Sequence, residues 1–211
     1  MKENRILIVI VGWNNTKDTI DATTSVLNQS YQNFDIALVD NGSKNKYRIP
    51  LETFSKMDDQ ILWMRNEKNL GFTKAINQVI KNFILGQDHY QYLALLNNDA
   101  IADPKWIKES LETIKKKKSK VVASKIIQAK HPERLESAGL YLTCLGEIIA
   151  QGYNTASSAK KWSRSCEVFG ASGGAVFYDV QIFDQLGLFD ENFPMGYEDA
   201  EYAMRCFTHN I

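Results

Sequence analysis

The first half of the chain alternates between short apolar runs and longer stretches in which apolar residues recur every three or four positions. The short runs predict buried β-strands, because a strand covered on both faces reads as continuous apolar sequence. Such runs occupy residues 5–11, 34–39, 61–64 and 92–96. Strands separated by helical stretches indicate an α/β fold, with a Rossmann-like, mostly parallel sheet and helices on both faces. In such sheets the loops at the carboxyl ends of the strands form the ligand crevice.

The longer stretches predict helices, because an apolar residue at every third or fourth position lines one helix face. The clearest helix covers residues 72–84 and can end at Gly86. Another is predicted at residues 17–28 with Thr16 as its cap. A further helix starts at Asp103-Pro104, a favourable pair for a helix N-terminus.

The pattern is less regular from residue 119 onward. The sequence predicts a strand, a hairpin, a polar loop and a glycine-containing strand, at residues 121–127, 139–152, 154–165 and 168–178 respectively. A short helix with Asp179 as its cap ends at Gly187, and another helix begins at Glu198. Because no repeat or interdomain linker interrupts the chain, we expect a single domain over residues 1–211.

Composition narrows the class of protein. The 211 residues include 25 basic and 25 acidic side chains, and this balance argues against a nucleic-acid partner. The longest apolar run, residues 6–11, is far shorter than the roughly 20 residues of a membrane span and is followed by a poor signal-peptide cleavage site. We therefore expect a cytoplasmic protein in which Cys144, Cys166 and Cys206 are reduced thiols.

Several common chemistries lack their motifs. The first strand is followed by Gly12-Trp-Asn-Asn-Thr16, which is not the glycine-rich phosphate loop of dinucleotide-binding domains or P-loop NTPases. Ser172 lies between glycines but outside the strand–turn–helix context of a hydrolase nucleophile. The three histidines are scattered, which favours solvated or core positions over catalytic or metal-binding ones.

Carboxylates therefore carry the candidate chemistry. Asp40 and Asp99 each follow a predicted strand, so both fall at the expected crevice. Asp99 follows Asn97 and Asn98, and carboxylate and amide oxygens suit a hard cation such as Mg²⁺ or Mn²⁺. Asp40 can accept hydrogen bonds from a base or ribose. Each segment is also a good turn without any ligand.

A third acidic group lies at the start of the last predicted helix. Glu198 and Asp199 are adjacent, and Glu201 lies in the same turn. Mutual repulsion would raise the pKa of at least one of them and suit a general base. The alternative is that these acids only stabilise the helix N-terminus through the macrodipole.

A lysine run, Lys115–Lys118 with Lys120, follows a predicted helix. A solvated helix end explains it most simply, since cations are favoured there. An anionic membrane surface is the alternative partner.

Taken together, four groups of residues resemble the sequence blocks of glycosyltransferase family 2, whose members have the GT-A fold. Each block alone is a weak signal, but their common order from about residue 6 to residue 206 is a strong one. The blocks are Val11-Gly-Trp-Asn14 with Leu27-Asn-Gln-Ser-Tyr31, Val39-Asp-Asn-Gly-Ser43, Asn69-Leu-Gly-Phe-Thr-Lys-Ala-Ile-Asn77 with Leu95-Leu-Asn-Asn-Asp99, and Gly170-Ala-Ser-Gly-Gly174 with Gly187-Leu-Phe-Asp-Glu191 and Gly196-Tyr-Glu-Asp199.

The resemblance implies an inverting transfer of a sugar from a nucleotide-diphosphate donor to a hydroxyl acceptor, without a covalent enzyme intermediate. Asp99 would hold the Mg²⁺ or Mn²⁺ that bridges the diphosphate, and Asp199, with Glu198 beside it, would be the general base. Residues 1–118 would form a nucleotide-binding half and residues 119–211 an acceptor-side half. The donor would be bound by Asn14, Asp40, Asn69, Gly71 and Asn98, with Asp40 on the base or ribose.

Two features depart from the family's usual pattern. The metal block reads Asn97-Asn98-Asp99, with one carboxylate, which resembles a rhamnosyltransferase-like branch and favours a dTDP- or UDP-sugar donor. The chain also ends soon after the helix that begins at Glu198, where family members usually continue with a further histidine near the metal. We expect the acceptor-side half to be cut short, with His209 as the candidate for that histidine.

The implied acceptor is a saccharide or a lipid-linked saccharide in cell-surface polysaccharide synthesis. The lysine run would then make a peripheral contact at the inner face of the membrane. Two alternatives stay open: a nucleotidyltransferase, which should show a glycine-rich, basic phosphate loop after the first strand, and a non-catalytic nucleotide-sugar-binding module, which would bind without turnover. The sequence leaves the sugar, the linkage and the oligomeric state open.

Overall fold

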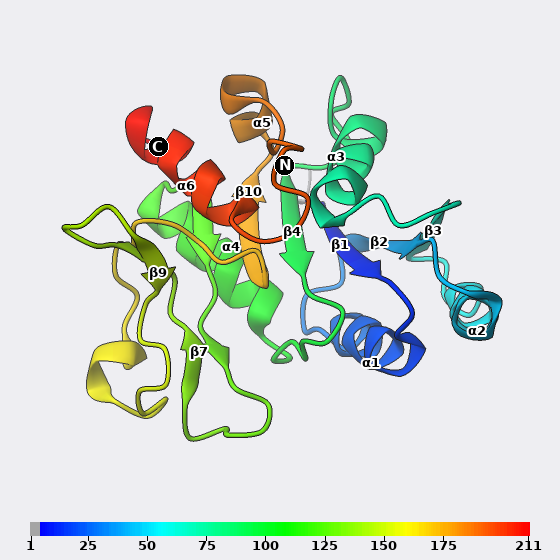
Figure 1. Cartoon of the computed structure of the whole chain (residues 1–211), viewed down its shortest axis with the longest axis horizontal. Helices are drawn as coiled ribbons and strands as arrows, with labels where there is room; N and C mark the ends of the chain where they lie inside the picture. The colour runs from blue at the N-terminus through cyan, green and yellow to red at the C-terminus, as the bar shows by residue number, and fades with distance from the viewer. Residues whose placement is uncertain (1–4) are drawn as a thin grey trace.

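The computed structural model describes residues 5–211 and shows an α/β architecture (Figure 1). Its main element is a six-stranded sheet with the strand order β3-β2-β1-β4-β10-β5. In chain order the first elements are β1 (Ile6–Gly12), α1 (Thr16–Leu27), β2 (Phe34–Asn41), α2 (Asn45–Ser55), β3 (Ile61–Asn66), α3 (Phe72–Phe83), β4 (Tyr92–Leu96) and α4 (Trp106–Lys117). They are followed by β5 (Val121–Ala123), β6 (Ile126–Ile127), β7 (Leu135–Ser137), β8 (Leu140–Leu142), β9 (Ile148–Ala150), a 3₁₀ turn at Lys160–Ser163, β10 (Ala175–Asp179), α5 (Gln181–Leu186) and α6 (Glu198–Thr208).

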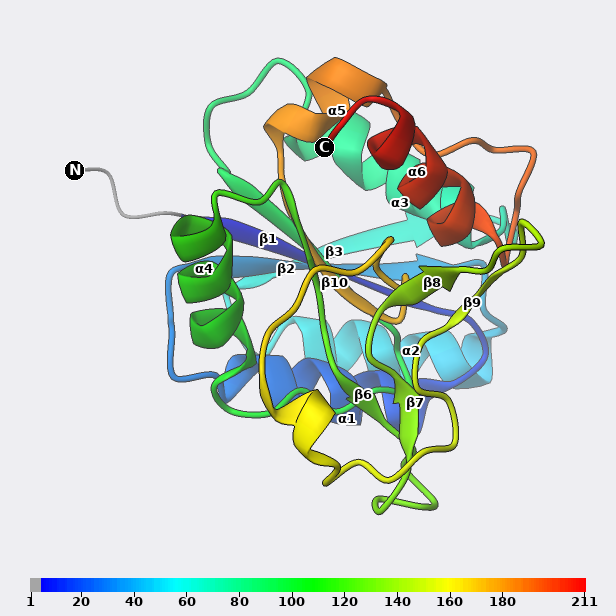
Figure 2. The same ribbon diagram turned by 90° about the vertical axis from the view of Figure 1, so that its left-hand side faces the viewer.

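The sheet separates two apolar cores, because successive side chains of its strands point to opposite faces. Ile6, Ile8 and Ile10 of β1 pack with the helices α1, α2 and α4. Leu7 and Val9 of the same strand pack with α3, α5 and α6 on the other face. Figure 2 shows these two helix layers, one on each side of the sheet. The continuous apolar run of β1 therefore reflects burial on both faces, as the sequence predicts.

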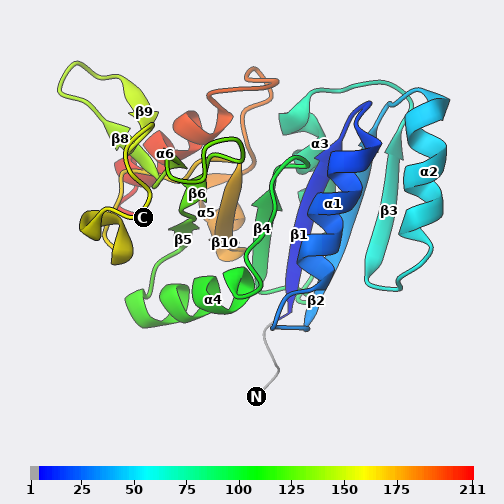
Figure 3. The same cartoon turned by 90° about the horizontal axis from the view of Figure 1, so that it is seen from below.

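The sheet is mostly parallel, but its last strands reverse direction. β1 pairs in parallel with β2 and β4, and β2 pairs in parallel with β3. β10 lies antiparallel between β4 and β5, with Ala175 opposite Leu96 (Figure 3). This reversal brings the segment before β10, residues 170–174, to the carboxyl end of β4. The backbone amide of Asn97 donates to the carbonyl of Gly174 there, at 2.9 Å.

Four predicted strands, most helices and the 139–152 hairpin are confirmed, and the differences have local causes. The predicted strand at 121–127 is broken into β5 and β6, which belong to different sheets. The predicted strand 168–178 is shorter in the structure and begins at Ala175, because the 170–174 segment contacts α6 and β4. The predicted polar loop at 154–165 contains the 3₁₀ turn. Helix α2 was not predicted, since its sequence is polar and contains Pro50.

Three predicted helix caps act differently in the structure. Asp103 precedes the N-cap of α4, which is Lys105, and its Oδ1 accepts a hydrogen bond from the Lys105 amide at 2.9 Å. Thr16 is the first residue of α1, and its hydroxyl donates to the carbonyl of Tyr47 at 2.7 Å, so it joins α1 to α2. Asp179 accepts a hydrogen bond from the amide of Gln181 at 3.0 Å, but the residue at the N-cap of α5 is Val180. Among residues 5–211, no helix is both long enough and apolar enough to cross a membrane.

Helix α6 lies unusually close to the glycine segment. A Cβ atom at Gly170 would lie 2.3 Å from the Cβ of Ala203, so only glycine allows this approach. Gly173 lies against the first turn of the same helix, where its Cβ would be 3.4 Å from Oε1 of Glu198. These two contacts fix α6 against the segment that follows the reversal of the sheet.

Gly170→Ala is expected to lower the free energy of unfolding by about 1–3 kcal/mol, the usual cost of overpacking a core. Denaturant titration measures this loss. Ala203→Gly removes the opposing methyl group and alone should cost about 1 kcal/mol as a helical glycine. The double variant should therefore be more stable than Gly170→Ala alone; losses that simply add would contradict the proposed contact.

Candidate functional site

The carboxyl edge of the parallel strands collects the polar loops of the chain. Gly12 at the end of β1 pairs in register with Asp40 near the end of β2. The loop that follows β4 begins at Asn97, which bonds to Gly174 of the glycine segment. Four segments from different parts of the sequence thus meet along one edge, in agreement with the expected position of the crevice.

Asp40 is completely buried at this edge, and only one of its two carboxylate oxygens has a hydrogen-bond partner among the described residues. Its Oδ1 accepts a hydrogen bond from the backbone amide of Ser43 at 3.1 Å, as expected for a turn. Its Oδ2 is buried and has no hydrogen-bond partner among residues 5–211. A buried carboxylate oxygen without a donor costs free energy. The turn therefore explains one oxygen of Asp40, and the other fits a donor group supplied by a ligand.

Asn14 joins the ends of β1 and β2. Its backbone amide donates to Oγ of Ser43 at 2.9 Å, and its side-chain oxygen accepts from the amide of Lys44 at 2.9 Å. To make both bonds it adopts a left-handed backbone conformation with φ of 52°. Asn14, predicted as a donor-binding residue, thus shapes the loop beside Asp40.

Asn69 and Gly71 surround a buried side chain that sequence reasoning missed, Asn41. The Asn41 amide donates to Oδ1 of Asn69 at 3.0 Å and to the carbonyl of Gly71 at 3.1 Å. Its oxygen accepts from the amide of Leu70 at 3.2 Å. Asn41 therefore holds the loop that leads into α3, and its place directly after Asp40 was the available signal.

Asn98 and Asp99 follow β4 and differ in the hydrogen bonds that their side chains make. The Asn98 amide donates to Oγ1 of Thr19 at 3.0 Å, which leaves its oxygen available. Asp99 is exposed, and no hydrogen bond or ion pair joins its carboxylate to another described side chain. No group of three or more His, Cys, Asp or Glu residues that could hold a metal occurs within residues 5–211. A single free carboxylate fits Mg²⁺ or Mn²⁺ that takes its other ligands from substrate phosphates and water.

Glu198 and Asp199 begin helix α6 beside the glycine segment. Oδ2 of Asp199 accepts from the amide of Gly173 at 2.9 Å, and its Oδ1 accepts from the amide of Ala200 at 2.7 Å. Glu198 is 7% exposed, and its Oε2 is buried without a partner in the described chain. Asp199 is thus held in place, whereas Glu198 keeps an unused acceptor.

The pKa of Glu198 is raised above its ordinary value. Burial is the largest cause, and the neighbouring charge of Asp199 adds to it. Hydrogen bonds from the backbone amides of Glu198 and Gly196 act in the opposite direction but are outweighed. The sequence predicted a raised pKa from mutual repulsion, and the structure assigns the larger share to burial.

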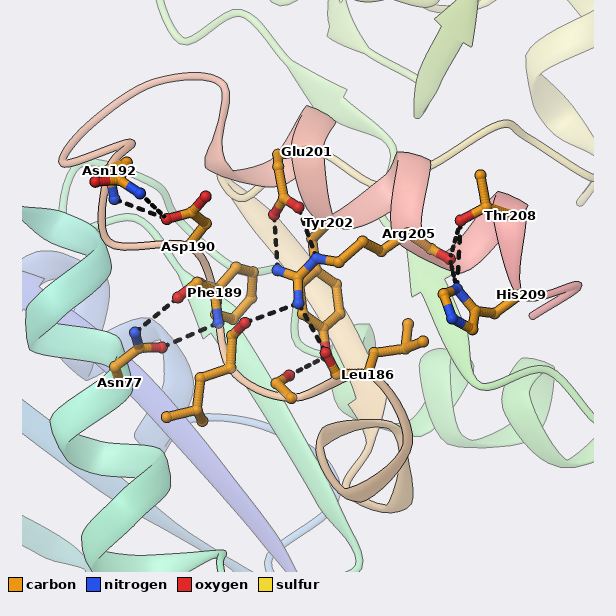
Figure 4. A network of polar contacts seen from close by, with 12 residues as sticks. Asn77, Leu186, Phe189, Asp190, Asn192, Glu201, Tyr202, Arg205, Thr208 and His209 are labelled. Atoms are coloured by element: carbon orange, nitrogen blue, oxygen red, sulfur yellow. Dashed lines mark hydrogen bonds and ion pairs between the residues drawn. The ribbon is translucent and has the colours of Figure 1, made fainter.

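Glu201 does not join this carboxylate pair. It forms an ion pair with Arg205 at 2.7 Å, and Arg205 also donates to the carbonyls of Leu186 and Leu188 (Figure 4). The guanidinium lies 4.5 Å from the ring centre of Tyr202. Glu201 and Arg205 therefore tie α6 to the chain that leaves α5, so the expected cluster of three acids is reduced to two.

Helix α3 holds the segment between α5 and α6 from the other side. Asn77 is buried, donates to the carbonyl of Phe189 at 2.9 Å and accepts from its amide at 3.2 Å (Figure 4). The amide of Phe72 donates to the carbonyl of Pro194 at 2.8 Å. These bonds satisfy the N-terminus of α3 and fix the residues that lead into Glu198.

His209 follows α6 at the end opposite to Glu198, and its Nδ1 lies 2.9 Å from the carbonyl of Arg205. An 11-residue helix is about 16 Å long, so His209 lies far from the carboxylate pair. This position gives no support to a role for His209 near a metal.

The lysine run lies at the opposite edge of the sheet. The amide of Asp179 donates to the carbonyl of Lys120 at 2.9 Å, and Asp179 is the register partner of Tyr92, the first residue of β4. Lys120 also pairs with the Asp179 carboxylate at 3.1 Å. The lysines are therefore separated from Asp99 by the length of β4, which favours the solvated helix end.

Known proteins were compared with the chain in sequence and in structure. The family model of Glycosyl transferase family 2 matches residues 7–187. An uncharacterized glycosyltransferase of Haemophilus influenzae is 30% identical over 111 residues, which are 53% of this chain and 33% of that protein. The glycosyltransferase GlyG of Streptococcus pneumoniae is 25% identical over 117 residues, which are 56% of this chain and 37% of that protein. The matched region thus spans about a third of these relatives.

Solved structures show the same fold. TarS 1–349 of S. aureus superposes with a TM-score of 0.65 at 15% identity, over 96% of this chain and 55% of that one. The mannosyltransferase PcManGT of Pyrobaculum calidifontis, solved with GDP-Man and Mn²⁺, superposes with a TM-score of 0.66 at 10% identity, over 95% of this chain and 51% of that one. The predicted GT-A-type α/β fold is confirmed.

Asn77→Ala is expected to lower the free energy of unfolding by about 2–4 kcal/mol, because it leaves the buried amide and carbonyl of Phe189 without partners. Hydrogen exchange should accelerate at Phe189 and in residues 187–197. Asn82→Ala, on the exposed face of the same helix, is the matched control and should change stability by about 0.5 kcal/mol or less. Equal losses in both variants would show that Asn77 does not hold this segment.

Glu198→Gln is expected to stabilise the fold at neutral pH, since it removes a buried charge but keeps an acceptor for the Gly196 amide. Well below pH 4.5, the ordinary glutamate pKa, Glu198 is protonated in both folded and unfolded chains, and the variants should melt alike. As the pH rises through the raised pKa, the wild-type chain alone loses stability. Melting temperatures measured across pH test this, and a difference that shrinks with rising pH would contradict it.

Proposed function

Because the chain belongs to glycosyltransferase family 2, we propose that it transfers a sugar from a nucleotide-diphosphate donor to a hydroxyl acceptor with inversion at the anomeric carbon. One observation supports this function at the candidate site. Two buried carboxylate oxygens lack donors among the described residues and belong to candidate site residues, Oδ2 of Asp40 and Oε2 of Glu198. Asp40 lies where a nucleoside would bind, and Glu198 is the first residue of α6, next to Asp199, the proposed general base.

Asp40 is the proposed nucleoside-binding residue. The N3–H of uracil or thymine is a single donor, and it matches the single unpaired oxygen of this carboxylate. Trp13, 54% exposed directly before Asn14, offers an aromatic face for the base. Asn14, Asn69 and Gly71 act in this proposal by shaping the loops around the base. We infer a dTDP- or UDP-sugar donor and a rhamnosyltransferase-like enzyme, in line with the Asn97-Asn98-Asp99 block.

Asp99 would hold Mg²⁺ or Mn²⁺ together with the donor diphosphate, and the Asn98 oxygen lies next to it in the chain. When bound, such a cation stabilises the negative charge of the leaving nucleoside diphosphate. The structurally similar mannosyltransferase was solved with GDP-Man and Mn²⁺, which supports a metal-assisted donor site of this class.

The carboxylate pair of α6 would accept the acceptor's proton. The acceptor oxygen forms a bond to the anomeric carbon as the bond from that carbon to the diphosphate oxygen breaks. The proton passes to Asp199, which the Gly173 amide holds, with Glu198 beside it as an acid whose pKa burial raises. A positioned base of this kind typically contributes 10²–10⁴-fold to the rate.

The proposal extends to the biological setting. The acceptor would be a saccharide or a lipid-linked saccharide of a cell-surface polysaccharide, made at the inner face of the membrane. Residues 1–118 would carry the donor-binding half of one catalytic domain, and residues 119–211 its acceptor-side half.

A thermal-shift panel of UDP, dTDP and GDP, each with and without Mn²⁺, tests donor binding. We expect one pyrimidine diphosphate to raise Tm by several degrees with Mn²⁺, since 100 Kd of ligand contributes about 2.7 kcal/mol. Asp40→Asn and Asp99→Ala should abolish the shift while remaining folded. Asp59→Asn, an exposed control, should retain it.

Absence of any nucleotide shift, or its persistence in Asp40→Asn, would overturn the proposed donor site. If the chain binds nucleotide but transfers no sugar from any donor, and Glu198→Gln likewise shows no transfer, the protein is a binding module without catalysis.

A further inference from the structure

Three residues between two fixed points of the chain project outward beside the carboxylate pair. Pro194 is fixed on one side, because its carbonyl accepts from the amide of Phe72 at 2.8 Å. Asp199 is fixed on the other side by the amide of Gly173 at 2.9 Å. The intervening exposed residues are Met195, Gly196 and Tyr197.

This turn presents two large apolar side chains to solvent. Met195 is 82% exposed and Tyr197 is 71% exposed, although they lie beside a buried acid. Gly196 and Tyr197 have φ angles of 81° and 68°. For tyrosine the left-handed region is less favourable than an ordinary backbone conformation, because Cβ comes close to the following carbonyl oxygen. The turn is therefore strained at Tyr197, and packing of the tyrosine ring does not offset this strain because the ring is exposed.

The turn is directly linked to Glu198. Glu198 directly follows Tyr197 in the chain, and its Oε2 stays unpaired among the described residues. An exposed aromatic ring thus adjoins a carboxylate that is more than nine-tenths buried and has a free acceptor. Strained residues of this kind cluster at ligand-binding sites.

We propose that Tyr197 is the platform on which the sugar ring of the acceptor stacks, so that the acceptor is a pyranose saccharide. This inference rests on the proposed transferase function and names the acceptor class for the same site. A pyranose has one face of C–H bonds, which packs on an aromatic ring, and a rim of hydroxyl groups, which bonds to carboxylates. Tyr197 and Glu198 offer these two surfaces in adjacent residues.

An alkyl chain fits this place less well. It would bury Met195 and Tyr197 but would leave Oε2 of Glu198 without a partner and further desolvated. The saccharide matches both the apolar ring and the acidic rim, and a lipid, if attached, would extend away from the turn.

The test uses the whole chain with the nucleoside diphosphate that binds it and Mn²⁺. Methyl α- and β-pyranosides of common hexoses are the probes, and saturation-transfer NMR measures their binding. Tyr197→Ala should weaken the best probe about tenfold or more, and Tyr197→Phe should change it less than threefold. Tyr197→Gly, which relieves the left-handed strain, should weaken the probe as much as alanine while raising Tm above that of Tyr197→Ala.

Tyr141→Ala is the matched control, because Tyr141 is also an exposed tyrosine, 53% exposed on β8. It should leave probe binding unchanged. None of these variants should alter the thermal shift by the nucleotide, which depends on Asp40.

Equal probe binding by Tyr197→Ala and wild type, or no probe binding to wild type with nucleotide bound, would overturn the inference and leave the donor site standing. Failure of every nucleotide to bind would overturn the proposed function itself, and the inference with it.

Discussion

The antiparallel insertion of β10 beside β4 is the constraint on which the candidate site depends. A parallel strand there would deliver the 170–174 segment to the opposite edge of the sheet. The reversal instead places Gly173 where its amide holds Asp199, and Gly170 where α6 can approach to Cβ contact distance. The carboxyl end of β4 and the start of α6 thus meet at one edge of the sheet, although they are about a hundred residues apart in sequence.

The residues around the site are held by hydrogen bonds, whereas two carboxylates inside it lack hydrogen-bond donors. α3 and α6 hold the 186–194 segment through Asn77, which bonds to the backbone of Phe189, and through Arg205, which bonds to the carbonyls of Leu186 and Leu188. Asp40 and Glu198, in contrast, each keep a buried oxygen without a donor in the described chain. Such groups lower stability unless something binds them. Because both carboxylates belong to candidate site residues, their unpaired oxygens fit a site that is preorganised for a ligand.

The sequence was sufficient for the parts that depend on local pattern. Apolar runs located the parallel strands, and turn residues placed Asp40 and Asp99 at their ends. It could not reveal the reversal of β10, because strand direction is set by long-range pairing. The sequence prediction also did not separate Glu201 from Glu198, although Arg205 follows Glu201 by four residues, the spacing of an ion pair on a helix. Asn41 and Asn77 read as ordinary polar residues until their backbone partners are known.

A crystal structure with UDP or dTDP and Mn²⁺ is the most direct test of the central claim that the unpaired oxygen of Asp40 receives the donor's base. The account predicts a hydrogen bond from the base N3–H to Oδ2 of Asp40, with the metal between Asp99 and the diphosphate. A nucleotide bound elsewhere, with Oδ2 of Asp40 still unpaired and Asp99 away from the metal, would contradict it.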